Sequence, residues 1–252
     1  MQNCGIGYSN LVLSARLSGL AEAALLPVAN LKSQQGADAY AWRVPALTAT
    51  LTLDLAAPSA VRVVSVHRAN LTGKASVTLT ASLNGTVVWS GSPVLRISSG
   101  QAIAQLPASV TVSQVQVTFS DPQNTDGYLS IPLLYIGDLW QPVRNFSTSS
   151  TSSFGLGVDE VTALSGSEYP AFRWIRRTLS IAHQSYGAAE VPTLQSIQRI
   201  AATGTNILFL PDPDADTLAA DAVFGRLSGG EIGNPFGAAD RRSWQFTLTE
   251  RL

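Results

Sequence analysis

Alternating hydrophobic and polar residues dominate the first half of the chain. Over positions 47–55, leucine or alanine at odd positions alternates with threonine or aspartate at even positions. Successive side chains of a β-strand point to opposite faces, so this segment predicts a strand with one buried and one solvated face. The pattern recurs over 77–83, and Asn84-Gly85 then supplies a turn pair that tolerates positive φ before 86–90 returns. We predict a β-hairpin here.

The alternation changes phase further along the chain. Val110 and Val112 occupy even positions, whereas Val115, Val117 and Phe119 occupy odd positions. A slip of one residue would turn the second set outward, so we predict a β-bulge at Ser113-Gln114. Another strand is expected from Tyr128 to Ile136. Several short strands separated by turns, with no convincing helix before this point, favour a β-sandwich or jelly roll.

The pattern becomes mixed after Trp140. The segment 147–153 is almost entirely serine and threonine, which is typical of a flexible connector or a long exposed loop. Phe172 to His183 predicts one long strand, and shorter strands are expected at 206–210 and near the C-terminus.

A helix is expected between these strands. Val191-Pro192 opens an apolar stripe of helical spacing, which Gly204 ends. We therefore predict a mainly β protein: a β-sandwich at 1–142, a Ser/Thr-rich connector at 143–154, and a smaller α+β domain with one helix at 155–252.

Charge is scarce in this sequence. Charged residues make up 13% of the chain, about half the usual share, and the formal net charge is -1. Two explanations stay open: part of the surface is buried against other subunits, or the exterior is rich in serine and threonine. The absence of a basic cluster argues against nucleic acid as a partner. We expect no membrane insertion, because no apolar run approaches the roughly 20 residues needed and the start lacks a basic leader.

Residues that could carry catalysis are sparse. His67 and His183 lie beside no G-x-S-x-G motif, and we expect both on the surface or at strand ends. Cys4 is the only cysteine, so no intrachain disulfide can form. The run Asp212-Pro-Asp-Ala-Asp216 resembles a calcium loop, but the sixth-position glycine and twelfth-position acid are missing, which favours a solvated turn. A calcium site completed by other loops stays open. We predict a non-enzyme without catalytic residues, cofactor or metal.

Five tryptophans remain as candidates for recognition, since their rings can stack on sugars or fill subunit contacts. Trp174 and Trp244 fall on apolar strand faces, which favours the core. Trp140, just before Pro142 at the domain boundary, and Trp89, at the end of a hairpin arm, are our candidate interface residues.

The order of several short motifs carries a resemblance. Asn-Leu-Val-Leu-Ser-Ala at 10–15, Leu-Pro-Val-Ala-Asn-Leu at 26–31 and Asn70-Leu71 resemble the opening of phage and prophage tail proteins with a galactose-binding-like (discoidin-type) jelly roll. The segment 135–140 is similar to the strand that closes this jelly roll. In the second half, an Arg-rich strand, a helix and a strand ending in Pro211-Asp-Pro213 resemble distal tail and minor tail proteins.

This resemblance implies a structural protein of the virion, located in the tail tip or baseplate of a long-tailed bacteriophage and made in the host bacterial cytoplasm. It implies a homo-oligomer, trimer or hexamer, that contacts other tail proteins of the tube, hub and fibre. It supplies no catalytic residues. Distal tail proteins commonly place the tube-facing domain first, whereas here the sandwich comes first.

The sequence bears on two other functions. A carbohydrate-binding module that attaches to a host surface glycan stays open as the alternative, with Trp89 and Trp140 near strand ends. A hydrolase acting on cell-wall sugars is disfavoured, because no acid pair or nucleophile stands out.

Overall fold

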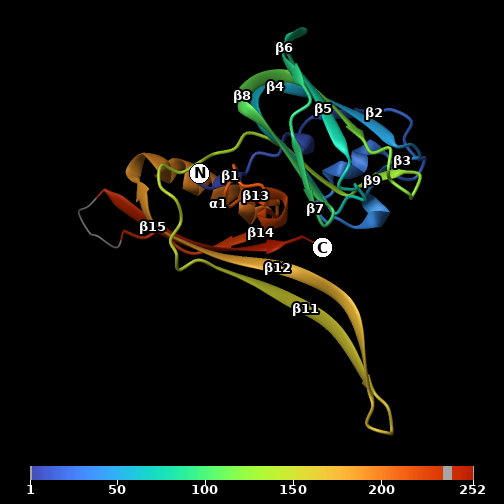
Figure 1. The fold of residues 1–252 in the computed structure, drawn as a ribbon. Coiled ribbons are helices and arrows are strands. Elements are labelled where there is room, and N and C mark those ends of the chain that lie inside the picture. The colour runs from blue at the N-terminus through green and yellow to red at the C-terminus, as the bar shows by residue number, and fades with distance from the viewer. Residues whose placement is uncertain (1, 235–239, 252) are drawn as a thin grey trace. The chain divides into compact units, whose positions relative to one another are not determined.

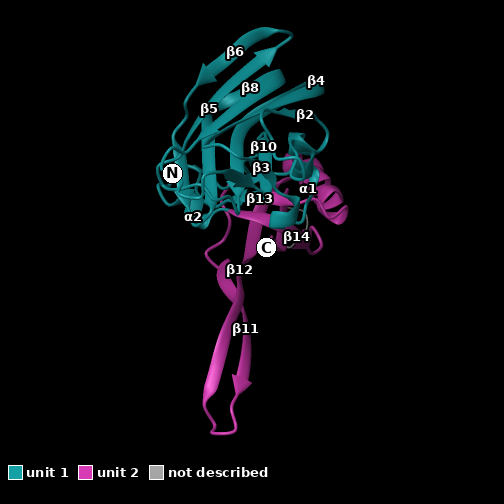
Figure 2. Cartoon of the chain, turned by 90° about the vertical axis from the view of Figure 1, so that its right-hand side faces the viewer, with its two compact units in different colours: residues 1–142, 208–222 teal, residues 143–207, 223–252 magenta. Residues whose placement is uncertain are grey.

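The computed structural model describes residues 2–234 and 240–251. The chain forms two compact units, which Figure 2 distinguishes by colour. Unit 1 comprises Met1–Pro142 and Leu208–Ala222, and unit 2 comprises Val143–Ile207 and Val223–Leu252. Residues 208–222, which the sequence analysis placed in the second domain, therefore belong to unit 1.

Unit 1 is built on a seven-stranded antiparallel sheet (Figure 1). Its two long central strands, β4 (Thr48–His67) and β8 (Gln101–Ser120), pair with each other. The remaining strands flank this pair: β10 (Leu133–Gly137) and β2 (Arg16–Gly19) pair with β4, β5 (Ser76–Leu83) and β7 (Leu95–Ser98) pair with β8, and β6 (Thr86–Gly91) pairs with β5.

A second, two-stranded sheet shares the core of unit 1. It consists of β3 (Trp42–Val44) and β9 (Leu129–Ile131). Apolar residues of both sheets and of the 3-10 helices η1 (Leu11–Leu13) and η2 (Val28–Lys32) form one buried cluster. Leu51, Leu53 and Val117 of the large sheet are fully buried, as their alternation predicts.

The smaller elements of unit 1 lie outside this sandwich. They are β1 (Gly5–Gly7), which pairs with β13 (Ile207–Leu210), the 3-10 helix η3 (Asp38–Tyr40), and α2 (Leu218–Asp221). The strand β13 was expected from the sequence, whereas α2 was not, because four residues are too few to show a helical period.

The predicted hairpin is confirmed. The strands β5 and β6 are joined by Asn84 and Gly85, whose φ angles are 50° and 82°. Positive φ at both central residues is what a tight two-residue hairpin turn requires.

Two strand predictions need correction. The register of β4 against β8 breaks between Asp54 and Ser59, opposite Ser113, so the extra residues lie on β4 and the predicted bulge at Ser113-Gln114 is on the wrong strand. Pro58, which has no N–H to donate, lies within this interruption. The expected strand 128–136 is divided at Pro132 into β9 and β10, which belong to different sheets.

Unit 2 contains four neighbouring antiparallel strands. Their order is β14 (Val223–Gly229), β15 (Arg241–Glu250), β12 (Glu168–Gly187) and β11 (Thr151–Thr162). Residues 151–154 of the expected connector are therefore strand residues of β11. Leu179 pairs with Leu248 and Ile181 with Phe246, and all four side chains are buried.

One long helix accompanies this sheet, as predicted. The helix α1 (Val191–Ala202) follows the 3-10 helix η4 (Ala188–Glu190), and its Leu194 and Ile197 are buried. Gly204, with a φ of 82°, follows its end. The predicted fold class, mainly β with a sandwich followed by a smaller α+β domain, is confirmed. Within the described residues, no helix is long and apolar enough to cross a membrane.

Candidate functional site

The β11–β12 hairpin extends well beyond the rest of the unit 2 sheet (Figure 1). The strand β15 pairs with β12 only from Thr178 to Gly187. In the described part of the chain, the segment Glu168–Arg177 of β12 therefore has only β11 as a neighbouring strand. Both long edges of this distal part carry unpaired backbone groups, which readily accept another strand.

One face of the hairpin is apolar. Leu156 pairs with Ile175 and Val158 pairs with Phe172, and directly paired residues share a face. Together with Phe154, these side chains form what we call the apolar face, and their exposed fractions range from 47% to 68%. Exposed apolar residues that gather on one face indicate a contact surface.

A β-bulge at Arg173 brings the side chains of Phe172 and Ile175 onto this face. The register shifts between Gly157 and Val158, which leaves Arg173 without a partner in β11. Phe172 and Ile175, three positions apart, consequently lie on the same face. Trp174 lies on the opposite face and is 38% exposed, so the prediction that it belongs to the core is wrong. The reason is that β15 does not reach this part of β12.

The opposite face is charged. The Trp174 ring lies over Gly157, and the Arg176 guanidinium is 5.2 Å from the centroid of that ring. Arg173 pairs with Asp159 across the strands. Around Gly157 the hairpin is thus amphipathic, with cations, an ion pair and one indole on this side and aliphatic and phenyl groups on the other. Farther along the hairpin, Val161 and Tyr169 form an exposed apolar pair on the charged side.

The apolar face lies on the same side of β12 as a buried surface. Alternate residues of a strand share a face, so Ile175, Leu179 and Ile181 lie on one side of β12. Leu179 and Ile181 are buried within unit 2, whereas Ile175 is 47% exposed. Arg177 lies between Ile175 and Leu179 on this side and is buried, so the apolar face is separated from the core of unit 2 by one arginine.

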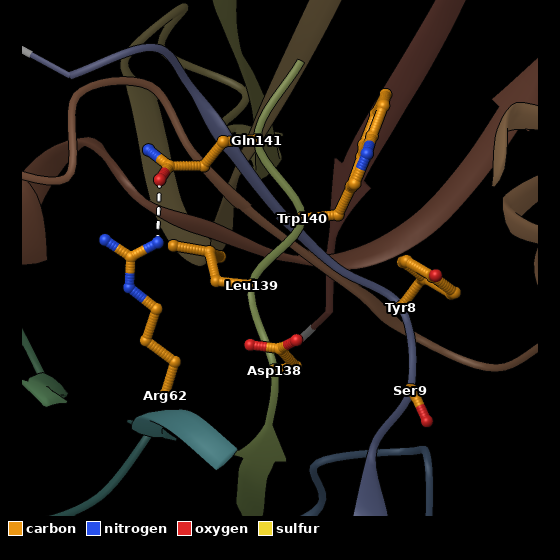
Figure 3. A pocket seen from close by; sticks show the side chains of 7 residues that line it. All are labelled: Tyr8, Ser9, Arg62, Asp138, Leu139, Trp140 and Gln141. Atoms are coloured by element: carbon orange, nitrogen blue, oxygen red, sulfur yellow. Dashed lines mark hydrogen bonds between the residues drawn. The ribbon is translucent and has the colours of Figure 1, made fainter. Parts of the chain in front are cut away.

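Unit 1 carries a second candidate, a groove with a cavity volume of about 320 Å³ (Figure 3). Its floor is the segment Asp138–Gln141, which follows β10, and its other residues come from the N-terminal segment and from β4. The backbones of Ile6 and Trp140 exchange hydrogen bonds of 2.8 and 3.0 Å, which hold the N-terminal segment beside the segment Asp138–Gln141.

The groove has two unlike walls. Arg62 and Gln141 point toward each other on one side of the Asp138–Gln141 segment, and Tyr8 and Trp140 lie on the other side (Figure 3). Arg62 Nη1 donates to Gln141 Oε1 at 2.7 Å. Asp138 lies between the walls, and its Oδ1 accepts a hydrogen bond of 2.7 Å from Ser109. One wall is therefore polar and the other aromatic.

Tyr8 and Tyr135 remain protonated beside this carboxylate. Burial raises the pKa of the Tyr8 phenol, and the negative charge of Asp138 raises it further. The same two causes, burial first, raise the pKa of Tyr135, whose hydroxyl donates to the Asp138 carbonyl at 2.8 Å. The Tyr8 hydroxyl is thus a hydrogen-bond donor at neutral pH.

The two tryptophans singled out from the sequence lie in different places. Trp140 lines the groove. Trp89 is partly buried against the sandwich core and is not a lining residue of the groove. Tyr8, Arg62 and Asp138 were missed, because they come from three distant segments and form no motif. The apolar face was missed because the sequence of β12 does not show which strands pair with it.

Both histidines are buried, and the expectation of a surface or strand-end position holds only for His67, which lies at a strand end. His67 ends β4 and is 2.6 Å from Ser65 Oγ and 2.8 Å from Gln101 Oε1. Ser65 is fully buried, which denies a substrate access to its hydroxyl. His183 lies inside β12, and its Nε2 is 2.7 Å from the Arg144 carbonyl.

The aspartates of the calcium-like run behave as turn residues. Asp212 accepts a hydrogen bond of 3.1 Å from the backbone N–H of Asp214. Throughout the described ranges, no group of three or more His, Cys, Asp or Glu side chains is placed to hold a metal ion.

Comparison with known proteins gives a likeness of fold only. No protein-family profile and no curated protein matches the sequence. Among solved structures, a family 32 carbohydrate-binding module from C. perfringens, in complex with galactose, is 16% identical with a TM-score of 0.40, and the match covers 53% of this chain and 98% of the module. The lectin domain of lectinolysin, complexed with Lewis B antigen, is 11% identical with a TM-score of 0.40, covering 51% and 95%.

A third similar structure is that of a larger protein, SpGH29. It is 18% identical with a TM-score of 0.39, and the match covers 52% of this chain but only 28% of that chain. Binding modules and lectin domains are in line with the galactose-binding-like jelly roll expected for the first half. At these TM-scores the likeness carries no argument about function.

Proposed function

We propose that this chain is a structural assembly protein of a bacteriophage tail tip or baseplate, which joins its neighbours through the β11–β12 hairpin. The observation that supports this proposal is the apolar face, which is exposed over two strands. A monomer in water gains nothing from such a surface, whereas a neighbouring subunit that covers it removes apolar area from water.

Covering the apolar face contributes part of the free energy of assembly, because association itself also costs several kcal/mol. Burying the exposed half of each of the five side chains is worth about 1 kcal/mol apiece at roughly 25 cal/mol per Å². Each copy thus offers on the order of 5 kcal/mol, before the free edges of the hairpin add backbone hydrogen bonds. A homo-oligomer, trimer or hexamer, can bring each hairpin against the next one by the same contact.

The tail-tip assignment itself is drawn from the order of the sequence motifs, including the segments 10–15, 26–31 and 211–213. In that setting the partners are other copies of the chain and the tail tube, hub and fibre proteins, and the location is the virion. The hairpin supplies the physical means of contact.

Light scattering after size exclusion tests the proposal. The unchanged chain should elute as an oligomer, and the double variant Leu156→Ser/Ile175→Ser should shift toward monomer. The matched control is Val161→Ser/Tyr169→Ser, which changes a similarly exposed cross-strand pair on the opposite face and should leave the oligomer in place. A highly soluble monomer of the unchanged chain at high concentration would contradict the proposal.

A second candidate function is carbohydrate binding by unit 1, for attachment to a host surface glycan. The observation that favours it is the groove, because an aromatic wall beside a carboxylate suits a sugar ring. A glycan array probed with the full chain tests it, and the absence of binding to every glycan would remove it.

A further inference from the structure

We propose that the groove of unit 1 binds a single neutral hexose residue, with Asp138 accepting hydrogen bonds from its hydroxyls and Trp140 and Tyr8 stacking against its C–H face. The proposal rests on the second candidate function and adds to it the location, the ligand class and the residue roles.

The aromatic wall supplies the apolar part of the contact. A pyranose ring presents C–H groups on its faces and hydroxyls around its rim, so it needs an apolar surface and polar groups at right angles to it. Trp140 and Tyr8 form such a surface on one side of the Asp138–Gln141 segment (Figure 3). Both side chains are about half-buried, which leaves ring area for a ligand.

Asp138 supplies a hydroxyl acceptor between the walls. Its Oδ1 accepts a hydrogen bond from Ser109, and its Oδ2 makes no hydrogen bond within the described residues. A carboxylate oxygen accepts strong charge-assisted hydrogen bonds from O–H donors. Asp138 also forms no ion pair in the described part of the chain, so its charge is available to a ligand.

Arg62 supplies the opposite charge across the groove. Its Nη1 and Nη2 donate to the side-chain oxygens of Gln141 and Gln2 at 2.7 and 3.1 Å, and both acceptors are neutral amides. Its Nε is buried without a partner. The lining thus holds one positive and one negative charge, each without an ionic partner. A charged sugar that is attracted by one of these groups is repelled by the other and gains little net electrostatic energy, whereas it must still lose the water around its own charge, so a neutral ligand is favoured.

The size of the groove is sufficient for one sugar ring. Its volume of about 320 Å³ lies at the lower end of small-molecule sites, which hold roughly 300–1,000 Å³. The walls are also held in place before binding, since Gln141 Nε2 donates to the Asn3 carbonyl at 2.8 Å and the Ile6 backbone pairs with that of Trp140. Such preorganisation lowers the entropic cost of binding.

Titration of the full chain with methyl glycosides tests the proposal. Glucose, galactose and mannose glycosides are the neutral probes, and glucuronate and glucosamine are the charged ones, followed by NMR chemical-shift changes. At least one neutral probe should bind with a dissociation constant on the order of 1 mM. Asp138→Asn should weaken that binding about tenfold or more, and Tyr8→Phe should weaken it less, since only a hydroxyl is lost.

The matched control is Asp54→Asn, which should leave binding unchanged. Asp54 also lies in unit 1, and its Oδ1 likewise accepts one side-chain hydrogen bond, from Gln114 at 2.7 Å. Thermal unfolding of each variant shows that it is folded. The proposal is overturned if no neutral probe binds, if Asp138→Asn binds as the unchanged chain does, or if glucuronate binds as tightly as glucose.

Carbohydrate binding by the chain and its assignment to this groove can be disproved separately. A glycan array without any signal removes carbohydrate binding altogether. An array signal that Asp138→Asn and Asp54→Asn retain equally removes only the assignment to this groove. Neither result bears on assembly, which is measured with variants of the hairpin in unit 2.

Discussion

The indole of Trp174 lies directly over Gly157 on the neighbouring strand, where a Cβ atom would overlap the ring. The absence of a side chain at Gly157 therefore lets the Trp174 ring from the neighbouring strand lie against the β11 backbone. The Arg176 guanidinium near the same ring extends this contact. One glycine thus decides how the charged face is organised.

Replacement of Gly157 tests this relationship. Gly157→Ala should displace the indole and destabilise the distal hairpin by about 1–3 kcal/mol, as overpacking does. The indole N–H resonance of Trp174 should move, and the amides of β11 should exchange faster with solvent. Gly155→Ala is the control, because its Cβ would lie 3.6 Å from the same ring, an ordinary contact. Equal effects of the two variants would refute the close approach.

The turn between β5 and β6 gives a second prediction. Gly85 has a φ of 82°, and a Cβ there would meet no atom within 4 Å, so the cost of Gly85→Ala is conformational only. It should lower the free energy of unfolding by about 1 kcal/mol. Gly73 has the same open surroundings but no positive φ, so Gly73→Ala should be neutral or slightly stabilising. Urea denaturation distinguishes the two, and a larger loss at Gly73 would be inconsistent with the turn.

His183 predicts how the stability of unit 2 depends on pH. Burial lowers the pKa of His183 below its ordinary 6.5, against the opposing effects of the Arg144 carbonyl and Glu190. The neutral ring is therefore favoured in the folded state, and its contribution, present above pH 6.5, is lost as the pH falls through the folded pKa. Most carboxylates titrate nearer pH 4, so a change in stability between pH 7 and pH 5 arises mainly from histidine.

Comparison with a variant isolates this contribution. The free energy of unfolding of the unchanged chain should fall more between pH 7 and pH 5 than that of His183→Gln. Gln can still donate to the Arg144 carbonyl but does not titrate. Parallel curves for the two proteins would show that His183 is not responsible.

Asn10 gives a prediction for the core of unit 1. Its side chain is buried, its Nδ2 donates to the Leu134 carbonyl at 2.9 Å, and its Oδ1 accepts from Val12 and Ile136 at 3.2 Å. Asn10→Asp replaces the donor by an oxygen that faces a carbonyl, so it should cost about 2–4 kcal/mol.

The control for this change is Asn30→Asp. Asn30 is only partly buried and its Nδ2 donates once, to the Ala41 carbonyl at 3.0 Å, so the loss should be distinctly smaller. Chemical denaturation measures both variants. A similar loss in the free energy of unfolding at the two positions would mean that the burial of Asn10 does not increase the cost of the substitution.

The sequence predicted those elements whose signals are local. The Asn84-Gly85 hairpin and the helix α1 each depend on a few adjacent residues, and both formed as expected. Pro132 shows the limit of this reasoning, because apolar residues continue on both sides of it although the chain passes from one sheet to another there.

Burial was harder to predict than strand formation. Trp174 and Trp244 lie in equally apolar strands, yet Trp244 is buried and Trp174 is not. The difference depends on which strands lie beside them, and a strand's own residues do not encode that. The groove is still harder to predict, because Tyr8, Arg62 and Asp138 come together only after three distant segments have paired.

Residues 208–222 belong to unit 1, although they follow residues 143–207 of unit 2 in the sequence. This order has a consequence for biosynthesis. The polypeptide passes between the units at 142–143, 207–208 and 222–223, so no single cleavage can release either one. A nascent chain that has emerged only as far as Pro142 lacks β13, the partner of β1, and α2. Domains normally complete themselves in the order of translation. The buried cluster of the sandwich lies entirely within residues 11–136, so it is complete early, whereas the pairing of β1 and the packing of α2 can form only after most of the second unit has been made.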